Sequence, residues 1–201
     1  MTKYFSAFAL LTIVLLLVSA VARAQQQTAT PSSTPLKLER ESKFNGNVTF
    51  PEVDGWELSE KTQYPNREMG YSVHYVSTAA RITVYVYSGG RTAIPNSLSG
   101  VVAEEMKATQ AGINSVVEQG YYESAKELKN ETITLGGENG KTKSLHVLYE
   151  LKANGRVFDS HIYLFPYNNY FVKLRMTGRK ATEPIPGLST LFEAIDLLFS
   201  K

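Results

Sequence analysis

The sequence predicts an α+β domain in which a mainly antiparallel sheet of about six strands is packed by a long middle helix and a carboxy-terminal helix. Short runs rich in Val, Ile, Tyr and Thr are bounded by turn residues, as in antiparallel strands. Two longer runs, 95–120 and 188–199, instead carry apolar residues at helical spacing. Because the strands come in groups rather than alternating with helices one by one, we expect α+β and not α/β.

The first 24 residues have the features of an export signal. An apolar run over 7–18 follows a basic residue, and Ala22 and Ala24 supply small residues at the two positions that a signal peptidase reads. We expect cleavage between Ala24 and Gln25 and a secreted or periplasmic location. The alternative is an uncleaved anchor, because the 19 uncharged residues over 4–22 come close to the length that spans a bilayer.

Residues 25–43 are predicted to be a flexible tether and 44–201 a single domain. The tether begins QQQTATPSSTP, which has no charge and no large apolar residue, whereas strand and helix periods start at Phe44. Without 1–24 the chain has as many basic as acidic residues, 19 of each. This balance argues against a nucleic-acid partner. The absence of Cys excludes disulfides and a thiol nucleophile.

The elements follow one another in a simple order. Runs 71–77 and 81–88 predict an antiparallel hairpin, and the apolar spacing over 95–120 predicts the middle helix, which Gly120 ends and Gly112 divides in two. The segment 121–130 fits either a helix or an extended strand.

The dipeptide Asn154-Gly155 favours a two-residue turn between strands 145–153 and 156–165. This turn pairs Ala153 with Arg156 and thereby fixes the register of the hairpin. One face is then the core face and holds Leu145, Val147, Tyr149, Leu151, Phe158, Ile162 and Leu164. The opposite face holds His146, Leu148, Glu150, Lys152, Val157, Asp159, His161 and Tyr163.

A third strand over 170–177 is predicted to join the same core, and the helix over 188–199 docks on the sheet through its apolar stripe. A three-residue loop, Pro166-Tyr167-Asn168, would place Arg175 beside Asp159. It would also add four residues to the core face, namely Tyr170, Val172, Leu174 and Met176.

Several segments together resemble the PsbP-like family over 44–201. They are Phe50-Pro51 followed by Trp56, the YVYSGG strand end, the LHVLYELKANGRVFDSHIYLF meander, the NNYFVKL strand and the closing FEAIDLLF helix. That family includes the photosystem accessory protein, DcrB-type bacterial envelope proteins and a nuclear-transport factor. The resemblance implies a sheet between helices and a non-enzymatic binding or assembly role. It gives no residue a function, and a photosystem function does not follow from a fold.

Four side chains on the open face of the 145–165 hairpin are the best candidates for a metal site: His146, Glu150, Asp159 and His161. Glu150 lies opposite Asp159, and facing like charges destabilise a sheet unless a cation relieves them. Imidazole and carboxylate are also ligands of zinc. The alternative is a solvated ladder in which Arg175 and Lys152 supply the counter-charge. We expect at most a weakly bound divalent ion and no other cofactor.

Four tyrosines of the first hairpin are expected to gather on one face: Tyr71, Tyr75, Tyr85 and Tyr87. Amphipathic rings on an exposed face would form a recognition platform for a peptide, a glycan or an apolar ligand. The alternative is that these rings pack beneath a helix.

Two segments look like catalytic motifs but lack an essential part. Residues 136–142, GGENGKT, resemble a phosphate-binding loop, but Leu135 replaces the first glycine and a strand follows where a helix is required. A plain strand connection is the alternative. Asp159-Ser160-His161 has the residue types of a catalytic triad, yet neighbouring side chains on a strand point to opposite faces.

The sequence therefore predicts an exported, non-enzymatic accessory or binding module. Its partner would be an envelope or secreted protein or a small ligand, with no nucleic acid and no membrane span once the signal is removed. The alternatives are a metal-assisted hydrolase that uses the face of His146, Glu150, Asp159 and His161, and a structural envelope protein that acts through oligomer contacts.

Overall fold

A computed structural model describes residues 48–180 and 184–200. Its strands are β1 (Glu57–Leu58), β2 (Thr62–Gln63), β3 (Tyr71–Val76), β4 (Ala80–Tyr87), β5 (Ser124–Thr134), β6 (Lys143–Ala153), β7 (Arg156–Tyr167) and β8 (Tyr170–Arg179). Its helices are α3 (Val101–Glu118) and α4 (Leu188–Phe199), with the short 3-10 turns η1 (Arg67–Met69) and η2 (Gly137–Asn139).

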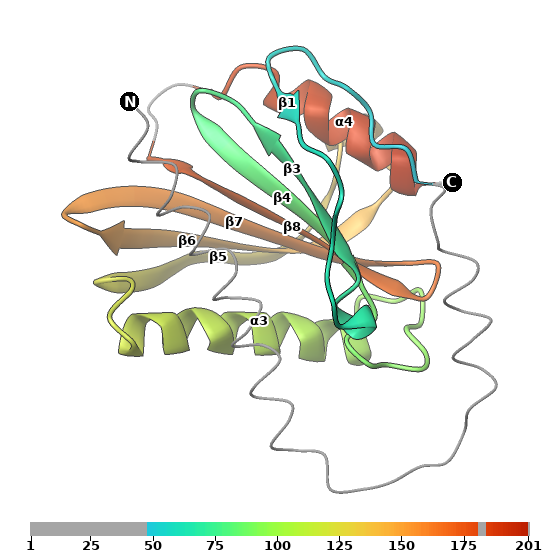
Figure 1. Ribbon diagram of the computed structural model, residues 1–201, viewed down its shortest axis with the longest axis horizontal. Helices are drawn as coiled ribbons and strands as arrows, with labels where there is room; N and C mark the ends of the chain where they lie inside the picture. Colours follow the sequence, from blue (N-terminus) through green and yellow to red (C-terminus); the bar gives the residue numbers. More distant parts are fainter. Residues whose placement is uncertain (1–47, 181–183, 201) are drawn as a thin grey trace, which may run out of the picture.

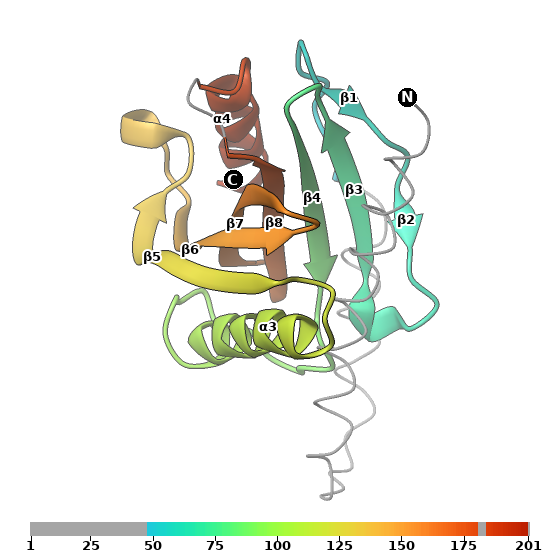
Figure 2. The same cartoon turned by 90° about the vertical axis from the view of Figure 1, so that its left-hand side faces the viewer.

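The described strands form one antiparallel sheet in the order β1-β3-β4-β8-β7-β6-β5, and β2 also pairs with β3. The helix α3 lies on one side of this sheet and α4 on the other (Figure 1). The predicted α+β class with an antiparallel sheet is confirmed. The sheet has eight strands rather than about six, because the two-residue strands β1 and β2 both pair with the outer edge of β3 (Figure 2).

Each helix covers a separate hydrophobic core. The core beneath α4 contains Trp56, Tyr75, Ile82, Val84, Leu174, Leu191, Ile195 and Phe199 among its buried residues. The core beneath α3 contains Val102, Met106, Ile113, Val116, Val147, Leu151, Ile162, Leu164 and Phe171 among its buried residues. The sheet is therefore buried on both faces, which explains why its central strands read as nearly continuous apolar runs.

The middle helix and the segment after it differ from the predicted details. The helix α3 is continuous, and Gly112 is buried within it rather than dividing it. The ambiguous segment 121–130 is largely strand, because β5 begins at Ser124. This strand forms an edge of the sheet and has a bulge between Glu127 and Lys129 (Figure 2).

The turn at Asn154-Gly155 is confirmed. Both residues have positive φ, 52° and 68°, and Ala153 pairs with Arg156. The predicted core face of this hairpin, from Leu145 to Leu164, packs in the core beneath α3 as expected.

The predicted register of the third strand is wrong by one residue. The turn between β7 and β8 has two residues, Asn168 and Asn169, both with positive φ, so Tyr167 pairs with Tyr170. A shift of one residue moves every side chain to the other face. Arg175 therefore pairs with Ile162 on the α3 face. The residues expected beside Leu145 instead pack beneath α4: Tyr170, Val172, Leu174 and Met176.

The predicted cleavage site at Ala24 and Gln25 and the tether over 25–43 lie outside the described residues. Of the helices that are described, none has both the length and the apolar character needed to cross a bilayer.

Candidate functional site

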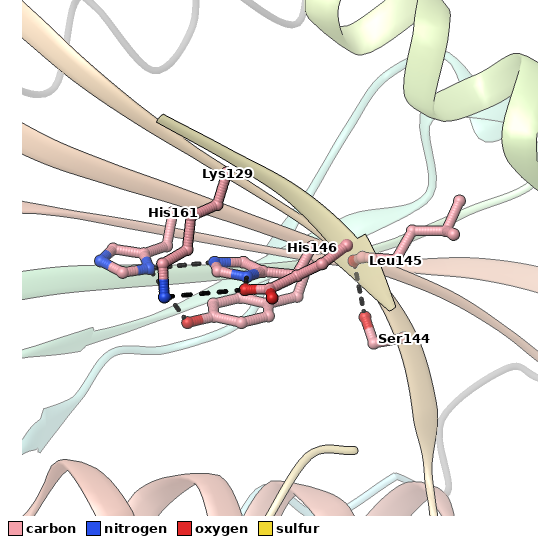
Figure 3. A network of polar contacts seen from close by, with 7 residues as sticks. Lys129, Ser144, Leu145, His146 and His161 are labelled. Atoms are coloured by element: carbon pink, nitrogen blue, oxygen red, sulfur yellow. Dashed lines mark hydrogen bonds and ion pairs between the residues drawn. The ribbon is translucent and has the colours of Figure 1, made fainter. Parts of the chain in front are cut away.

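Three rings from β6 and β7 stack on the α4 face of the sheet (Figure 3). The rings of His146 and Tyr163 are nearly parallel with centroids 4.6 Å apart, and the ring of His161 lies 5.3 Å from that of His146. Phe192 of α4 meets the Tyr163 ring edge-on at 5.0 Å. Glu131, on the edge strand β5, lies directly opposite His146. We call Glu131, His146, His161 and Tyr163 the histidine array.

Both imidazoles of the histidine array are held in the neutral form. Burial, together with the neighbouring His146 and the charge of Lys129, lowers the pKa of His161 to about 4. Burial also lowers the pKa of His146, although the hydrogen bond and the charge of Glu131 oppose this effect. A general base works best when its pKa is near the working pH, so these rings are weak bases at neutral pH.

The neutral state fixes the direction of the hydrogen bonds in the array (Figure 3). Glu131 Oε1 lies 3.2 Å from His146 Nδ1, and His146 Nε2 lies 3.1 Å from His161 Nδ1. Because a carboxylate only accepts, His146 donates from Nδ1 and must accept at Nε2. His161 then donates from Nδ1, which also lies 3.3 Å from the Tyr163 hydroxyl. The hydrogen bonds between the two imidazoles and Glu131 thus donate in one direction, from His161 to His146 and from His146 to the Glu131 carboxylate.

The two acids of the predicted metal site lie farther along the same strands. Glu150 faces Asp159 across β6 and β7, as predicted. Their counter-charge is Lys180, which forms an ion pair with Glu150 and whose pKa is raised by the hydrogen bond and charge of Glu150 and by the charge of Asp159. The predicted counter-charges were wrong, because Lys152 pairs with another acid and Arg175 is on the opposite face.

The described side chains do not form the predicted four-residue metal site. Along an extended strand, His146 and Glu150 are separated by about 13 Å. Within the described ranges, no group of three or more His, Asp or Glu side chains is arranged to hold a metal ion. The carboxylate that contacts a histidine is that of Glu131. The bulge in β5 places Glu131 opposite His146; without the bulge, Asn130 would occupy that position.

The four tyrosines of the first hairpin do not share a face. Tyr71 and Tyr75 lie in the core beneath α4, whereas Tyr85 and Tyr87 lie in the core beneath α3. Tyr71 pairs with Val86, so the tyrosines on either side of Val86 point to the other face. None of the four is more than 5% exposed. The expected shared face is therefore wrong, and the rings pack beneath helices.

A cleft of about 520 Å³ opens at the end of the sheet where β7 turns into β8. We call it the turn cleft; it is lined by 96–98, 141–143, 166–169 and 199–200. Its charged lining residues are Lys141 and Lys143, and no acid contributes to the lining. Leu98, Pro166 and Phe199 provide apolar surface. Small-molecule sites commonly combine such a volume, about 300–1,000 Å³, with apolar walls and a few polar groups.

Two polar groups of the turn cleft stand out. The Lys143 ammonium donates a hydrogen bond of 2.7 Å to the Thr134 hydroxyl, which positions its charge beside the cleft. Thr142 Oγ1 is buried and has no hydrogen-bond partner among the described residues. Because a buried hydroxyl without a partner is unfavourable, this atom is a natural contact for a ligand.

Asp196 of α4 holds the segment that carries these lysines. Its carboxylate accepts hydrogen bonds from the backbone N–H of Lys141, at 3.1 and 3.0 Å, and of Thr142, at 2.7 Å. Two of the backbone amides that a phosphate would need in the 136–142 segment are therefore occupied by an internal carboxylate. This segment connects β5 to β6, which confirms the plain strand connection.

Sequence reasoning missed the turn cleft because its walls come from four separate segments. The signal available in the sequence was the run Lys141-Thr142-Lys143, which begins within the GGENGKT segment and leads into a strand. The glycines before this run resemble a nucleotide-binding loop, whereas Lys141 and Lys143 line the cleft.

No protein-family model matches this chain, and no curated protein sequence matches it significantly. Among solved structures, LpqN of Mycobacterium tuberculosis, involved in cell envelope biogenesis, is similar with a TM-score of 0.38 and 13% identity. The likeness covers 86% of this chain and 97% of LpqN. PA94 of Pseudomonas aeruginosa, a protein of unknown function, is similar with a TM-score of 0.32 and 12% identity, over 62% of this chain and 70% of PA94.

At TM-scores below 0.5, neither likeness assigns a function to this chain. The predicted PsbP-like resemblance has no support from a family model and stays a prediction. The arrangement that it implied, a sheet between helices, is present in the structure (Figure 1).

Proposed function

We propose that the protein is an exported, non-enzymatic binding module whose ligand is a small anionic molecule with an apolar part, bound in the turn cleft. The observation that carries this proposal is the charge of the cleft, because both charged residues of its lining, Lys141 and Lys143, are basic. Export is supported by the sequence over 1–24, with its apolar run and small residues before Gln25.

The cleft supports a ligand with two chemically different ends. An anionic group would lie between the two lysine ammonium groups and accept a hydrogen bond from the Thr142 hydroxyl, which has no partner among the described residues. The apolar part would pack against Leu98 and Phe199. A second cleft of about 420 Å³, between α3 and β5, has both Lys107 and Glu127 in its lining and therefore offers no such charge preference.

The non-enzymatic reading is supported by the histidine array. Its rings have lowered pKa values and their facing nitrogens are engaged with each other. The acids that would complete a hydrolase site, Glu150 and Asp159, are associated with Lys180 instead. A binding role uses the turn cleft and leaves the array as a structural contact between β5, β6 and β7.

The proposal is tested by calorimetric titration of the protein with decanoate, with decanol as the uncharged counterpart. We expect decanoate to bind and decanol to bind much more weakly. The double variant K141Q/K143Q should raise the dissociation constant for decanoate about tenfold or more, as expected for lost charge-assisted contacts.

The matched control is K107Q/K126Q, which removes the same charge from two exposed lysines elsewhere. It should leave decanoate binding within about twofold of the original protein, since it removes no contact in the turn cleft. Equal losses in both double variants would mean that decanoate senses only net charge or occupies the second cleft, and the proposal would then be rejected.

A further inference from the structure

Two arginines lie side by side on the α3 face of the sheet, away from the turn cleft. Arg81 near the start of β4 pairs with Thr177, and Arg175 on β8 pairs with Thr83. The two arginines are therefore diagonal neighbours on adjacent strands, a relation that places their backbones about 7–8 Å apart.

Neither arginine has an ionic partner in the described chain. The ion pairs found within 48–180 and 184–200 involve neither of them. Arg175 is only 9% exposed, and its single hydrogen bond among these residues runs from Nη2 to the Tyr122 hydroxyl at 2.9 Å. The Nε atoms of both Arg81 and Arg175 are buried without a hydrogen-bond partner. Arg175 is buried and Arg81 is half-buried. Charges removed from water are normally paired, so this pair of cations calls for an anion.

Neither Tyr85 nor His74, which lie on the same face beside the two arginines, supplies that anion. Burial raises the pKa of the Tyr85 phenol, although the charges of Arg175 and Arg81 oppose the rise, so the phenol is neutral at pH 7. Burial, together with the charge of Arg81, lowers the pKa of His74 to about 4, so this ring is neutral as well. The face keeps the two positive charges of its guanidinium groups.

We propose that this face binds a tetrahedral oxyanion, a phosphate or sulfate group, between Arg81 and Arg175. Guanidinium groups match such anions through paired N–H donors. Two guanidinium groups on different strands need a ligand with more than two acceptor oxygens to engage both, which favours a phosphate over a carboxylate. This site is separate from the turn cleft and does not depend on the proposed function.

The test is a calorimetric titration of the full chain with inorganic phosphate, together with the thermal unfolding midpoint in phosphate. Both measurements are compared with sodium chloride at equal ionic strength. Phosphate should bind and should raise the midpoint more than chloride does, because a ligand that binds only the folded state stabilises it. R81Q should raise the dissociation constant about tenfold, the equivalent of one lost charge-assisted hydrogen bond.

The matched control is R91Q, which removes one exposed arginine that pairs with Glu104. It should bind phosphate as the original protein does. K141Q/K143Q should also keep phosphate binding on this face, which separates the outcome from that of the turn cleft. R81Q and R175K serve as the main variants, because R175Q would remove the charge of a buried residue. R175K keeps the charge but lacks the planar guanidinium donors, so it should bind phosphate more weakly than the original protein does.

Sedimentation with vesicles of phosphatidylglycerol and phosphatidylcholine distinguishes a lipid phosphate from a soluble one. Binding to these vesicles that R81Q weakens would identify a lipid headgroup as the source, and phosphate binding without vesicle binding would identify a soluble ligand. The proposal is overturned if folded R81Q and R175K bind phosphate as tightly as the original protein, or if phosphate has no effect beyond that of chloride.

Discussion

The histidine array shows how the surroundings of a residue decide its chemistry. His146 is 6% exposed and lies between a carboxylate and a second imidazole. In water these rings would titrate near pH 6.5, but burial lowers the pKa of both. The neutral rings can then donate and accept in one direction toward Glu131.

The lowered pKa values predict a loss of stability in acid. Unfolding restores the pKa of His161 from about 4 to 6.5, so the unfolded chain binds protons more readily between these values. The free energy of unfolding should therefore have its full value above about pH 6.5 and should fall as the pH drops toward 4. We expect His161 to contribute about 1–3 kcal/mol to this fall.

Urea unfolding at pH 7.5, 6 and 5 measures this effect in the original protein and in H161Q. The variant should lose less stability between pH 7.5 and pH 5 than the original protein, because it cannot take up the proton. Identical pH dependence in the two proteins would show that His161 is not held neutral by the fold.

At the residue scale, the sequence predicted side-chain positions correctly where the Asn154-Gly155 turn set the register. Asn154-Gly155 correctly put His146 and His161 on one face and Glu150 opposite Asp159. It could not place Glu131, because a bulge in a neighbouring strand leaves no clear mark in a sequence whose edge strand is polar on both sides.

At the element scale, Asp196 connects α4 to the segment between β5 and β6. Asp196 is 4% exposed, and its carboxylate accepts hydrogen bonds only from backbone amides in the described chain. The segment also needs Gly140, because a Cβ atom at that position would lie 1.5 Å from the carbonyl oxygen of Leu135. These two features shape one wall of the turn cleft.

Replacement of Asp196 should uncouple this contact. D196A leaves the amides of Lys141 and Thr142 without their partner, and we expect a loss of about 2–4 kcal/mol in the free energy of unfolding. D196N keeps an oxygen acceptor and should lose less. Chemical denaturation of each variant measures the change.

The control is E193A, which removes an exposed carboxylate from the same helix. It should change stability by less than about 0.5 kcal/mol. If D196A were as stable as E193A, the carboxylate would not be what holds the segment to α4.

The elements themselves could largely be predicted, and the errors came from turns. Two asparagines at 168 and 169 both adopt positive φ, as asparagine tolerates better than most residues, and close a two-residue turn. The three-residue loop Pro166-Tyr167-Asn168 was predicted in its place, so the predicted register of β8 was wrong by one residue. Arg175 was therefore predicted to be a counter-charge on the same face as Asp159. It lies instead on the α3 face, diagonally across from Arg81 on the neighbouring strand.

At the scale of the whole molecule, the sheet has a helix and a hydrophobic core on each face (Figures 1 and 2). The periodicities of the sequence predicted two helices packed on the sheet, because apolar stripes must be buried, but they gave the sheet only one core face. A sheet between helices was implied only by the PsbP-like resemblance. The turn cleft could not be predicted in the same way, since it exists only where four distant segments meet at one end of the sheet.

The central claim is that an anionic ligand occupies the turn cleft. The most direct measurement is a two-dimensional amide NMR titration of the isotopically labelled protein with decanoate. We expect the largest shift changes in 96–98, 141–143, 167–169 and 199–200, with little change at Ala125 and Glu127 of the second cleft or at the histidine array. Shift changes centred on the second cleft between α3 and β5, or spread evenly over the surface, would contradict the claim.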